Sequence, residues 1–552
     1  MPIVGVVSHP PEFARRWREK GYWRDRSLAA EFWEIFERYG DRTAISDEHG
    51  RSRTYAELGE RAARLAANLY GLGLRPRDRV VLQLPNTIEF VETYFALQKL
   101  GVIPIAALPA HRHREVSQFV ATTEAVAVFS PAEYRGFSFA EMVDRVADER
   151  PSLRFGIHLG ESPDQAGQAQ HVSLAALLER KPLPEWVDAV EEVEIDPDDP
   201  AVLQLSGGTT GIPKLIPRTH NDYAYNSRTA TSVCEIRGEH VLLLVLPIAH
   251  NLPLACPGLQ GFLMAGARVV VATSSNPPDV FRLIETERIT HIHAVPALII
   301  TWINAEESAT RDLASVRVIQ SGGQRLQPEV RTRTEKLLPS CTVQENFGMA
   351  EGLLMFVRLD DPENVRLETC GRPMSPDDEV RLVDEDGNDV PDGWVGEMIC
   401  RGPYTLRGYF QAEDHNRVAF TPDGFYRSGD LMRRHRSGNF VVAGRSKDVI
   451  NRGGEKISAE EVENLILSHP AVVNVACVAV PDERLGERMC ACVVLKPGGE
   501  LTLEDLCGYL LEFGIAKYKL PERLEIVDDL PLSSLGKVSK KALVASLTEQ
   551  RR

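Results

Sequence analysis

The sequence predicts an α/β protein in which a large N-terminal domain of parallel-rich sheets and helices is followed by a small α+β domain. Apolar runs alternate with helix-like segments over residues 58–126 and again from residue 200, the pattern of parallel strands joined by helices. A chain of 552 residues is also too long for one hydrophobic core. Finally, the C-terminal hundred or so residues carry their own helix caps and strands.

The elements of the large domain follow in chain order. Residues 191–200 are acidic and typical of a linker, and the apolar run 201–205 predicts a buried strand. Val280, Leu283 and Ile284 share one face of a helix predicted over 278–288. Further strands are predicted over 241–246, 267–272, 291–295 and 316–319. These strands and their helices predict a parallel sheet that is covered on both faces.

The C-terminal segment predicts a compact α+β unit. Ser458 with Glu461 matches a capping box that opens a helix, and Pro470 ends that helix. Thr502 with Asp505 predicts a second cap, for a helix through Phe513. Strands are expected over 472–480 and 490–495. From these patterns alone the domain boundary falls anywhere between residues 436 and 454.

Composition excludes several classes of protein. Counting 63 basic and 79 acidic side chains gives a formal charge of −16, which argues against a general nucleic-acid binder. The nine cysteines form no Cys-x-x-Cys pair, which is typical of reduced thiols in the cytosol. No apolar run approaches the 18 residues of a membrane span. We therefore expect a cytoplasmic enzyme without a membrane segment, and the oligomeric state stays open, a homodimer included.

The stretch 206–214 (SGGTTGIPK) predicts a loop that holds the phosphates of a nucleotide. Glycines allow the backbone to approach an anion closely, hydroxyls donate hydrogen bonds and lysine adds positive charge. The stretch is not a Walker A loop, because two residues separate its last glycine from the lysine. The alternative is an ordinary flexible surface loop. The candidate phosphate ligands are Ser206, Gly207, Gly208, Thr209, Thr210, Gly211 and Lys214.

This loop and five later motifs resemble, in order, those of the adenylate-forming superfamily of acyl-CoA synthetases, luciferases and adenylation domains. The motifs are 346–351 (NFGMAE), 396–402 (GEMICRG), 426–430 (YRSGD), 444–448 (GRSKD) and 536–537 (GK). The resemblance extends from about residue 41 to residue 543. It implies that the enzyme uses ATP and Mg²⁺ to join AMP to a carboxylic acid, with release of pyrophosphate, and then passes the acyl group to a thiol.

The resemblance also assigns roles to residues. It places the hinge between the domains at Lys447, so that residues 1–446 form the large domain and 447–552 the small one. Glu351 and Thr209 would bind the metal, and Lys537 would bridge the acyl carboxylate and the α-phosphate. The remaining nucleotide contacts would come from Gly322, Gly323, Gln324, Phe347, Gly348, Asp430 and Arg445.

Each role has a structural alternative. Glu351 could be a dipole partner at a helix start, and Asp430 could belong to a Gly-Asp turn. Arg445 could form an ordinary salt bridge, and Lys537 could be a solvated lysine. The ordered set of motifs favours the functional interpretation for all four residues.

Residues 246–254 (LPIAHNLPL) resemble the aryl-acid branch, the salicylate and 2,3-dihydroxybenzoate AMP ligases of siderophore assembly. By this resemblance catalytic His250 abuts the carboxylate and Asn251 binds the ortho hydroxyl. By the same resemblance the position of Cys256 distinguishes the two acids, and its weakly polar thiol favours salicylate over 2,3-dihydroxybenzoate. The alternative is that Cys256 is simply a small buried hydrophobic residue. A helix cap is the alternative for the His250–Asn251 pair.

The predicted substrate contacts also include Ser321, Gly322 and Asn346. Asn346 departs from the family, in which a small apolar residue precedes the aromatic one, so it could bond a ring substituent. Dihydroxybenzoate and substituted salicylates therefore stay open beside salicylate.

No Gly-Gly-x-Ser attachment pattern for phosphopantetheine occurs in the chain. The expected acceptor is therefore the phosphopantetheine thiol of a separate aryl carrier protein, which would dock on the small domain in siderophore or nonribosomal peptide biosynthesis. The alternatives are an aryl-CoA ligase, a luciferase-like oxygenase and a non-catalytic AMP sensor. Retention of Lys214, Glu351, Asp430, Arg445 and Lys537 argues against the last.

Overall fold

The computed structural model describes residues 3–160, 167–206, 213–306, 310–445, 448–453, 455–482, 484–532 and 538–549. Seven predicted functional residues lie outside these ranges, and their roles stay predictions: Gly207, Gly208, Thr209, Thr210, Gly211, Lys447 and Lys537. No helix within the described ranges is long and apolar enough to cross a bilayer.

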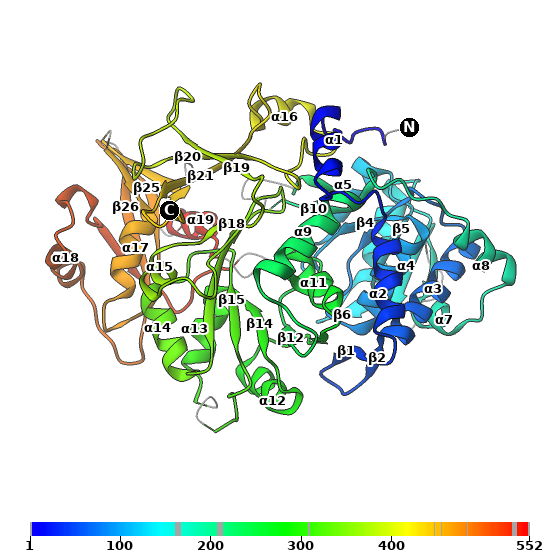
Figure 1. Ribbon diagram of the computed structural model, residues 1–552. Helices are drawn as coiled ribbons and strands as arrows, with labels where there is room; N and C mark the ends of the chain where they lie inside the picture. Colours follow the sequence, from blue (N-terminus) through cyan, green and yellow to red (C-terminus); the bar gives the residue numbers. More distant parts are fainter. Residues whose placement is uncertain are drawn as a thin grey trace.

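A seven-stranded sheet forms one half of the large domain (Figure 1). All neighbouring strands are parallel except the hairpin of β10 and β11. In spatial order the strands are β11 (Leu215–Thr219), β10 (Pro200–Leu205), β4 (Ile103–Ala106), β3 (Arg79–Leu82), β5 (Ala127–Pro131), β8 (Phe155–Leu159) and β9 (Gln170–Ser173). The hairpin at the edge carries the phosphate-loop segment.

A nine-stranded sheet forms the other half. Its six central strands, from β16 to β1, are parallel, and antiparallel strands close both edges. The order is β18 (Arg372–Pro373), β17 (Leu354–Phe356), β16 (Thr342–Gly348), β15 (Val318–Ser321), β14 (His291–Ala294), β12 (Val241–Leu244), β13 (Arg268–Val271), β1 (Thr43–Asp47) and β2 (Ser52–Thr54).

Helices cover both faces of these sheets. One hydrophobic core joins the sheets through the helix layer between them, so nearly every residue of α4 is buried. Two further cores lie under the outer helices. The large-domain helices are α1 (Pro11–Glu19), α2 (Leu28–Arg38), α3 (Tyr55–Leu72), α4 (Ile88–Leu100), α5 (His113–Thr123), α6 (Phe139–Glu149), α7 (Leu174–Glu179), α8 (Pro184–Glu191), α9 (His220–Val233), α10 (Asn251–Ala255), α11 (Gly258–Met264), α12 (Pro277–Glu287), α13 (Pro296–Ile303), α14 (Pro328–Leu337), α15 (Glu363–Glu368) and α16 (Glu413–Ala419).

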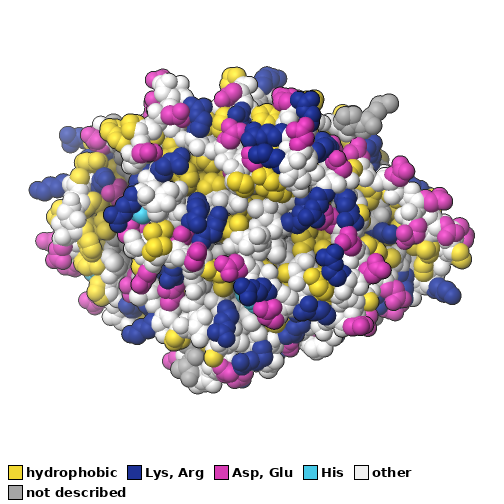
Figure 2. Space-filling view, viewed as in Figure 1, with side chains coloured by type: hydrophobic (Ala, Val, Ile, Leu, Met, Phe, Trp, Pro, Cys, Tyr) yellow, Lys and Arg dark blue, Asp and Glu magenta, His cyan; other side chains and the backbone are white. Residues whose placement is uncertain are grey.

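An antiparallel four-stranded sheet completes the part before the predicted hinge. It contains β19 (Glu379–Val383), β20 (Gly396–Arg401), β21 (Tyr426–Arg434) and β22 (Phe440–Arg445). A short hairpin, β6 (Glu133–Tyr134) with β7 (Phe137–Ser138), precedes α6. On the face in Figure 2, Lys and Arg side chains are interspersed with Asp and Glu.

The residues after the predicted hinge have their own sheet and cores. The sheet contains β23 (Val449–Arg452), β24 (Glu455–Ser458), β25 (Val472–Asp482), β26 (Gly486–Leu495) and β27 (Arg523–Ile526). Its helices are α17 (Ala459–Leu467), α18 (Leu503–Glu512), the 3₁₀ turn η3 (Lys517–Lys519) and α19 (Lys540–Glu549). They form the orange-to-red lobe of Figure 1.

The fold class predicted from the sequence is confirmed, and the differences lie at element ends. Ser458 and Thr502 both cap their helices by accepting from the backbone amides of Glu461 and Asp505. The complete capping box forms at Thr502, whereas the Glu461 carboxylate binds Lys519. The strand expected over 316–319 instead spans Val318–Ser321. Strand pairing causes this shift, because β14 pairs with residues 318–321, while Val316 is buried in the preceding turn.

Candidate functional site

The two ends of the phosphate-loop segment, Ser206 and Lys214, are held together by hydrogen bonds. The Ser206 amide donates to the Lys214 carbonyl at 3.0 Å, and the Lys214 amide donates to Ser206 Oγ at 2.9 Å. The β10–β11 ladder continues directly from this pair. The amide and the hydroxyl of Ser206 are therefore both bonded to the backbone of Lys214, which holds the two ends of the loop segment together.

Glu351 lies in the turn between β16 and β17, so the alternative of a helix start is wrong. Its carboxylate is buried and accepts a hydrogen bond from the Tyr409 hydroxyl at 2.8 Å. The Tyr409 hydroxyl also lies 2.9 Å from that of Tyr426, and Lys214 Nζ lies 5.9 Å from the Tyr409 ring centroid. Burial raises the pKa of Glu351, and the bond from Tyr409 opposes that shift. Tyr409 thus connects the loop lysine with the predicted metal ligand.

The donor set fits Mg²⁺ bound together with a nucleotide. Mg²⁺ takes one or two protein carboxylates and completes its shell with phosphate oxygens and water. Among the described residues no cluster of three or more His, Cys, Asp or Glu side chains could hold a metal alone. One buried carboxylate, Glu351, near a phosphate-loop lysine is the arrangement that this mode of binding needs.

Asp430 and Arg445 face each other across neighbouring strands. They are direct partners in the β21–β22 ladder, and Arg445 Nε donates to Asp430 Oδ1 at 2.7 Å. The turn alternative for Asp430 is wrong, because this residue lies inside β21. The salt bridge considered for Arg445 does form, and its partner is Asp430 itself. The pair holds a buried carboxylate at a fixed position, as a ribose ligand requires.

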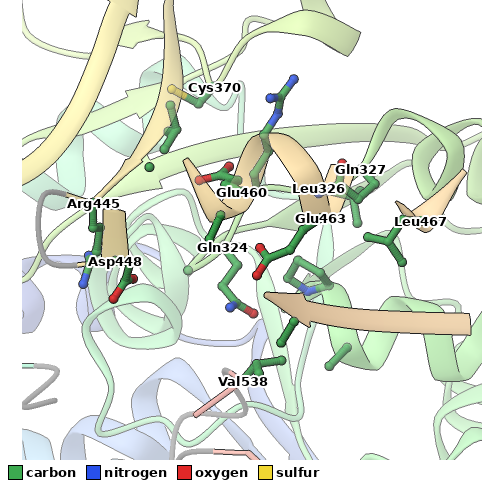
Figure 3. A pocket seen from close by; sticks show the side chains of 18 of the residues that line it. Gln324, Leu326, Gln327, Cys370, Arg445, Asp448, Glu460, Glu463, Leu467 and Val538 are labelled. Carbon is green, nitrogen blue, oxygen red and sulfur yellow. The ribbon is translucent and has the colours of Figure 1, made fainter. Parts of the chain in front are cut away.

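A cavity of about 210 Å³ lies where the two lobes meet (Figure 3). The nucleotide candidates on its walls are Gly323, Gln324, Phe347, Gly348, Asp430 and Arg445, and Asn346 joins them. The small lobe contributes Glu460, Glu463, Val538 and Lys540. Val538 is the residue after predicted Lys537, and it bridges to Leu532 across that segment. Residues that lie far apart in the sequence therefore share one space.

Several cavity and site residues carry no recognisable sequence signal. Lys540 Nζ contacts Glu463 Oε1 at 2.7 Å, and burial raises the pKa of Glu460 to about 7. Tyr409, which holds Glu351, was also not predicted. In the sequence each is an isolated residue in an amphipathic helix or a loop, and only its packing reveals a place near the site.

His250 rather than Asn251 caps α10. The His250 side chain accepts a hydrogen bond from the Leu252 amide at 3.3 Å, so the helix-cap alternative is confirmed for His250, and its contact with the acid stays a prediction. His250 lines a small second cavity, whose other walls are Leu246, Pro247, Leu252, Val295, Gly322 and Gly323. The segment that predicted an acid pocket therefore faces the glycine pair after β15.

Asn251 and Cys256 contact each other inside the core. Asn251 Nδ2 donates to Cys256 Sγ at 3.2 Å, and Asn251 Oδ1 accepts from the Tyr223 hydroxyl at 2.8 Å. Both residues are buried beside the cavity and are not among its lining residues. Burial raises the pKa of Cys256 to about 12, so its thiol stays protonated. The two predicted specificity residues form one coupled unit, oriented by a tyrosine.

Ser321 and Asn346 point to opposite faces of the large sheet. Ser321 pairs with Glu345, which binds Arg331 of α14 at 2.6 Å, so Ser321 faces the outer helices. Asn346 faces the other way, and its amide lies against Gly322, where a Cβ would be 2.1 Å from Asn346 Oδ1. Ser321 could therefore meet the acid through its backbone, whereas Asn346 could use its side chain.

Comparison with known families shows two matches along this chain. The model of the AMP-binding enzyme family matches residues 32–410. The model of the AMP-binding enzyme C-terminal domain matches residues 461–537. The two matches follow the two lobes of the structure.

Three curated relatives are similar over nearly their whole length. A salicylyl-CoA synthase / salicylate adenylyltransferase from a Streptomyces species is 47% identical, with 98% of each chain covered. A 2,3-dihydroxybenzoate-AMP ligase from Bacillus subtilis is 44% identical, covering 99% of this chain and 98% of the relative. A salicyl-AMP ligase / salicyl-S-ArCP synthetase from Mycobacterium tuberculosis is 43% identical, covering 99% and 95%.

A solved structure is also similar to this chain over nearly its whole length. The apo structure of MbtA from Mycobacterium smegmatis superposes with a TM-score of 0.75, at 41% identity and 98% coverage of each chain.

Proposed function

Because the chain belongs to the AMP-binding enzyme family, we propose that it is an aryl-acid adenylating ligase with salicylate as its preferred substrate. A carboxylate oxygen of the acid attacks the α-phosphorus of ATP, and the bond to pyrophosphate breaks. The thiol of an acceptor then attacks the acyl carbon, and AMP leaves. The observation that carries the proposal is that His250 lines one small cavity with Gly322 and Gly323 and directly precedes Asn251, which contacts Cys256, in a chain 43–47% identical to aryl-acid ligases.

Different residues of the chain bind different parts of ATP and the acid in the adenylation step. Lys214 and the loop that it closes position the phosphates, while Asp430, held by Arg445, accepts from the ribose hydroxyls. Glu351 and the predicted Thr209 would hold Mg²⁺, which screens the negative charge of the phosphates. Lys537 is proposed to stabilise charge as the acid attacks. Positioning and charge stabilisation are what phosphoryl chemistry asks of a protein.

The proposed contacts to the carboxylate and the ortho hydroxyl of the acid come from polar side chains of fixed orientation. His250 abuts the carboxylate from the N-terminus of α10. The Asn251 amide is held by Tyr223 at its oxygen and contacts Cys256 through its nitrogen. Its second N–H is proposed to donate to an ortho hydroxyl, which requires the bound acid to extend the small cavity as far as this buried amide. An acid without that hydroxyl would leave a buried donor unpaired, and this disfavours plain benzoate.

We propose the pantetheine thiol of a separate aryl carrier protein as the acceptor. The name of the Mycobacterium tuberculosis relative includes such a transfer, whereas the name of the Streptomyces relative includes coenzyme A. The two acceptors are distinguished by the rate of thioester formation from one preformed aryl-AMP. Equal or faster transfer to coenzyme A would make the enzyme an aryl-CoA ligase.

The first test is ATP–pyrophosphate exchange with salicylate, 2,3-dihydroxybenzoate, benzoate and a methylsalicylate as separate substrates. We expect exchange led by a 2-hydroxylated acid, with salicylate ahead of benzoate. Absence of exchange with every aryl acid, under conditions in which an established ligase is active, would refute the proposed activity.

Cys256→Ser should raise kcat/KM for 2,3-dihydroxybenzoate relative to salicylate. A hydroxyl can pair with a second ring hydroxyl, whereas a protonated thiol is a weak partner, and an unpaired buried hydroxyl costs about 1–3 kcal/mol, which corresponds to a factor of about 5 to 150. The measurement is the ratio of exchange rates for the two acids. Cys341→Ser is the matched control, because Cys341 is a buried cysteine of another core and lines neither of the two cavities described above. An unchanged ratio in Cys256→Ser would remove Cys256 from specificity.

A further inference from the structure

Arg218 is a fully buried arginine near the end of β11, the strand that follows the phosphate-loop segment. Its side chain is 0% exposed, and its sequence context predicts no role for it. Taking a guanidinium out of water is costly, and a buried ion pair seldom adds net stability in return. A charge at this depth therefore needs an explanation from the groups that it contacts.

Asp222 holds the guanidinium from one side. Arg218 Nε donates to Asp222 Oδ1 at 2.8 Å, and Asp222 Oδ2 accepts from the amide and the hydroxyl of Thr219, the N-cap of α9. Burial opposes the charged form, yet Asp222 and Tyr223 raise the pKa of Arg218 overall, so the guanidinium stays charged. Its Nη2 is buried without a hydrogen-bond partner among the described residues. An ion pair that served stability alone would leave no such donor unpaired.

A second nitrogen of the guanidinium reaches the turn that carries the predicted metal ligand. Arg218 Nη1 donates to the Ala350 carbonyl at 3.1 Å, and Ala350 directly precedes Glu351. The next carbonyl, that of Glu351, accepts from the Leu406 amide at 2.8 Å. Because Mg²⁺ requires its oxygen ligands at about 2.1 Å in a nearly ideal octahedron, a small shift of this turn would weaken metal binding.

The flat face of the same guanidinium lies over Tyr223. Arg218 Cζ is 4.7 Å from the centroid of the Tyr223 ring. The Tyr223 hydroxyl donates to Asn251 Oδ1 at 2.8 Å and accepts from Gln204 Nε2 at 3.2 Å. The tyrosine therefore orients the amide that is proposed to bind the acid, and Arg218 fixes the plane of the tyrosine ring.

We propose that Arg218 is a positioning residue that fixes the metal-binding turn and the acid pocket relative to each other. Attack of the acid on the α-phosphorus needs both substrates in one geometry, so a displacement of either side lowers the rate. Arginine suits this role, because its rigid fork donates in two directions while its face stacks on an aromatic ring. The inference rests on the proposed aryl-acid adenylation.

Arg218→Met should raise both the KM of salicylate and the Mg²⁺ concentration for half-maximal exchange by about tenfold, and lower kcat by about as much. Methionine fills the apolar space but donates neither to Asp222 nor to Ala350. The measurement is ATP–pyrophosphate exchange with the full-length enzyme, titrated with salicylate at saturating Mg²⁺ and ATP, and with Mg²⁺ at saturating salicylate and ATP.

The joint shift of both constants distinguishes Arg218 from residues that act on one side only. Tyr223→Phe removes the hydroxyl that orients Asn251 and keeps the ring beneath Arg218, so it should raise the KM of salicylate alone. Glu351→Gln should raise the Mg²⁺ requirement and leave the KM of salicylate unchanged, because Glu351 does not contact the acid pocket residues.

Two further variants keep the test decisive if Arg218→Met does not fold, since that change leaves the Asp222 carboxylate buried without its cation. Arg218→Met combined with Asp222→Asn removes both charges and keeps an acceptor for Thr219. Arg218→Lys keeps a positive charge beside Asp222, but an ammonium cannot also donate to Ala350 and stack on Tyr223. Both variants should still show the joint shift.

Arg228→Met is the matched control. Arg228 also bonds one carboxylate and one main-chain carbonyl, those of Glu31 at 2.7 Å and Tyr22 at 2.8 Å, and it lines neither cavity. Its loss should lower the thermal midpoint of unfolding and leave both constants unchanged.

The role of Arg218 is refuted, while aryl-acid adenylation stands, if its folded variants keep both constants within about twofold of the unaltered enzyme or shift only one of them. Shifts of equal size in Arg228→Met would also refute it, because a general loss of stability would then explain them. Absence of exchange with every aryl acid in the unaltered enzyme refutes both proposals.

Discussion

Lys537→Ala should lower the rate of aryl-adenylate formation about 10²–10³-fold and largely spare transfer from preformed aryl-AMP to the thiol. The expected size is that of removing one preorganised charged donor from a transition state. The selectivity follows from the proposed role, since the lysine neutralises charge only while the carboxylate attacks phosphorus. Pyrophosphate exchange measures the first step, and thioester formation from synthetic aryl-AMP measures the second.

Lys541→Ala is the matched control for this experiment. Lys541 is an exposed lysine on α19, four residues further along the same lobe, so its loss should change neither step. An equal loss in both half-reactions of Lys537→Ala would contradict the assigned role. It would indicate that the residue supports the position of the small lobe as a whole.

Glu351→Gln should lower pyrophosphate exchange at least about 10²-fold and raise the Mg²⁺ concentration needed for half-maximal rate. An amide lacks the charge that a hard cation requires, yet its oxygen can still accept the hydrogen bond from Tyr409. The fold should therefore survive. The measurement is a Mg²⁺ titration of the exchange rate at saturating acid and ATP.

Glu92→Gln controls for the loss of a buried carboxylate. Glu92 is fully buried between Arg53 and Arg61, far along the chain from the site. Its replacement should lower the thermal midpoint of unfolding without shifting the Mg²⁺ dependence. An unchanged Mg²⁺ requirement in Glu351→Gln would remove Glu351 from the metal site.

The interface between the two lobes contains the residues on which the Lys537→Ala prediction depends. The cavity at the junction brings Asp430 and Arg445 of the large lobe together with Val538 of the small one. Because Lys537 directly precedes Val538, a modest rotation of the small lobe would carry the lysine segment with it. The separable effects expected for Lys537→Ala depend on such movement about the predicted hinge.

The sequence by itself determined the alternating layers, the glycine-rich loop, the order of the motifs and the His250–Cys256 segment. These features follow from local rules: apolar periodicity selects strands and helices, and glycine, serine and lysine at close spacing suit phosphate. Such patterns are complete within a few residues. These patterns can therefore be interpreted without knowing which residues pack against them.

Only the tertiary structure decided the rest. Tyr409 reaches Glu351 across 58 residues of chain, and Asn346 meets Gly322 across two strands. The register between β14 and β15, rather than the apolar run, set where β15 begins. The residues that make such contacts are far apart in the sequence and follow no periodic pattern. The contacts can therefore be identified only after strand pairing and burial have determined which side chains lie together.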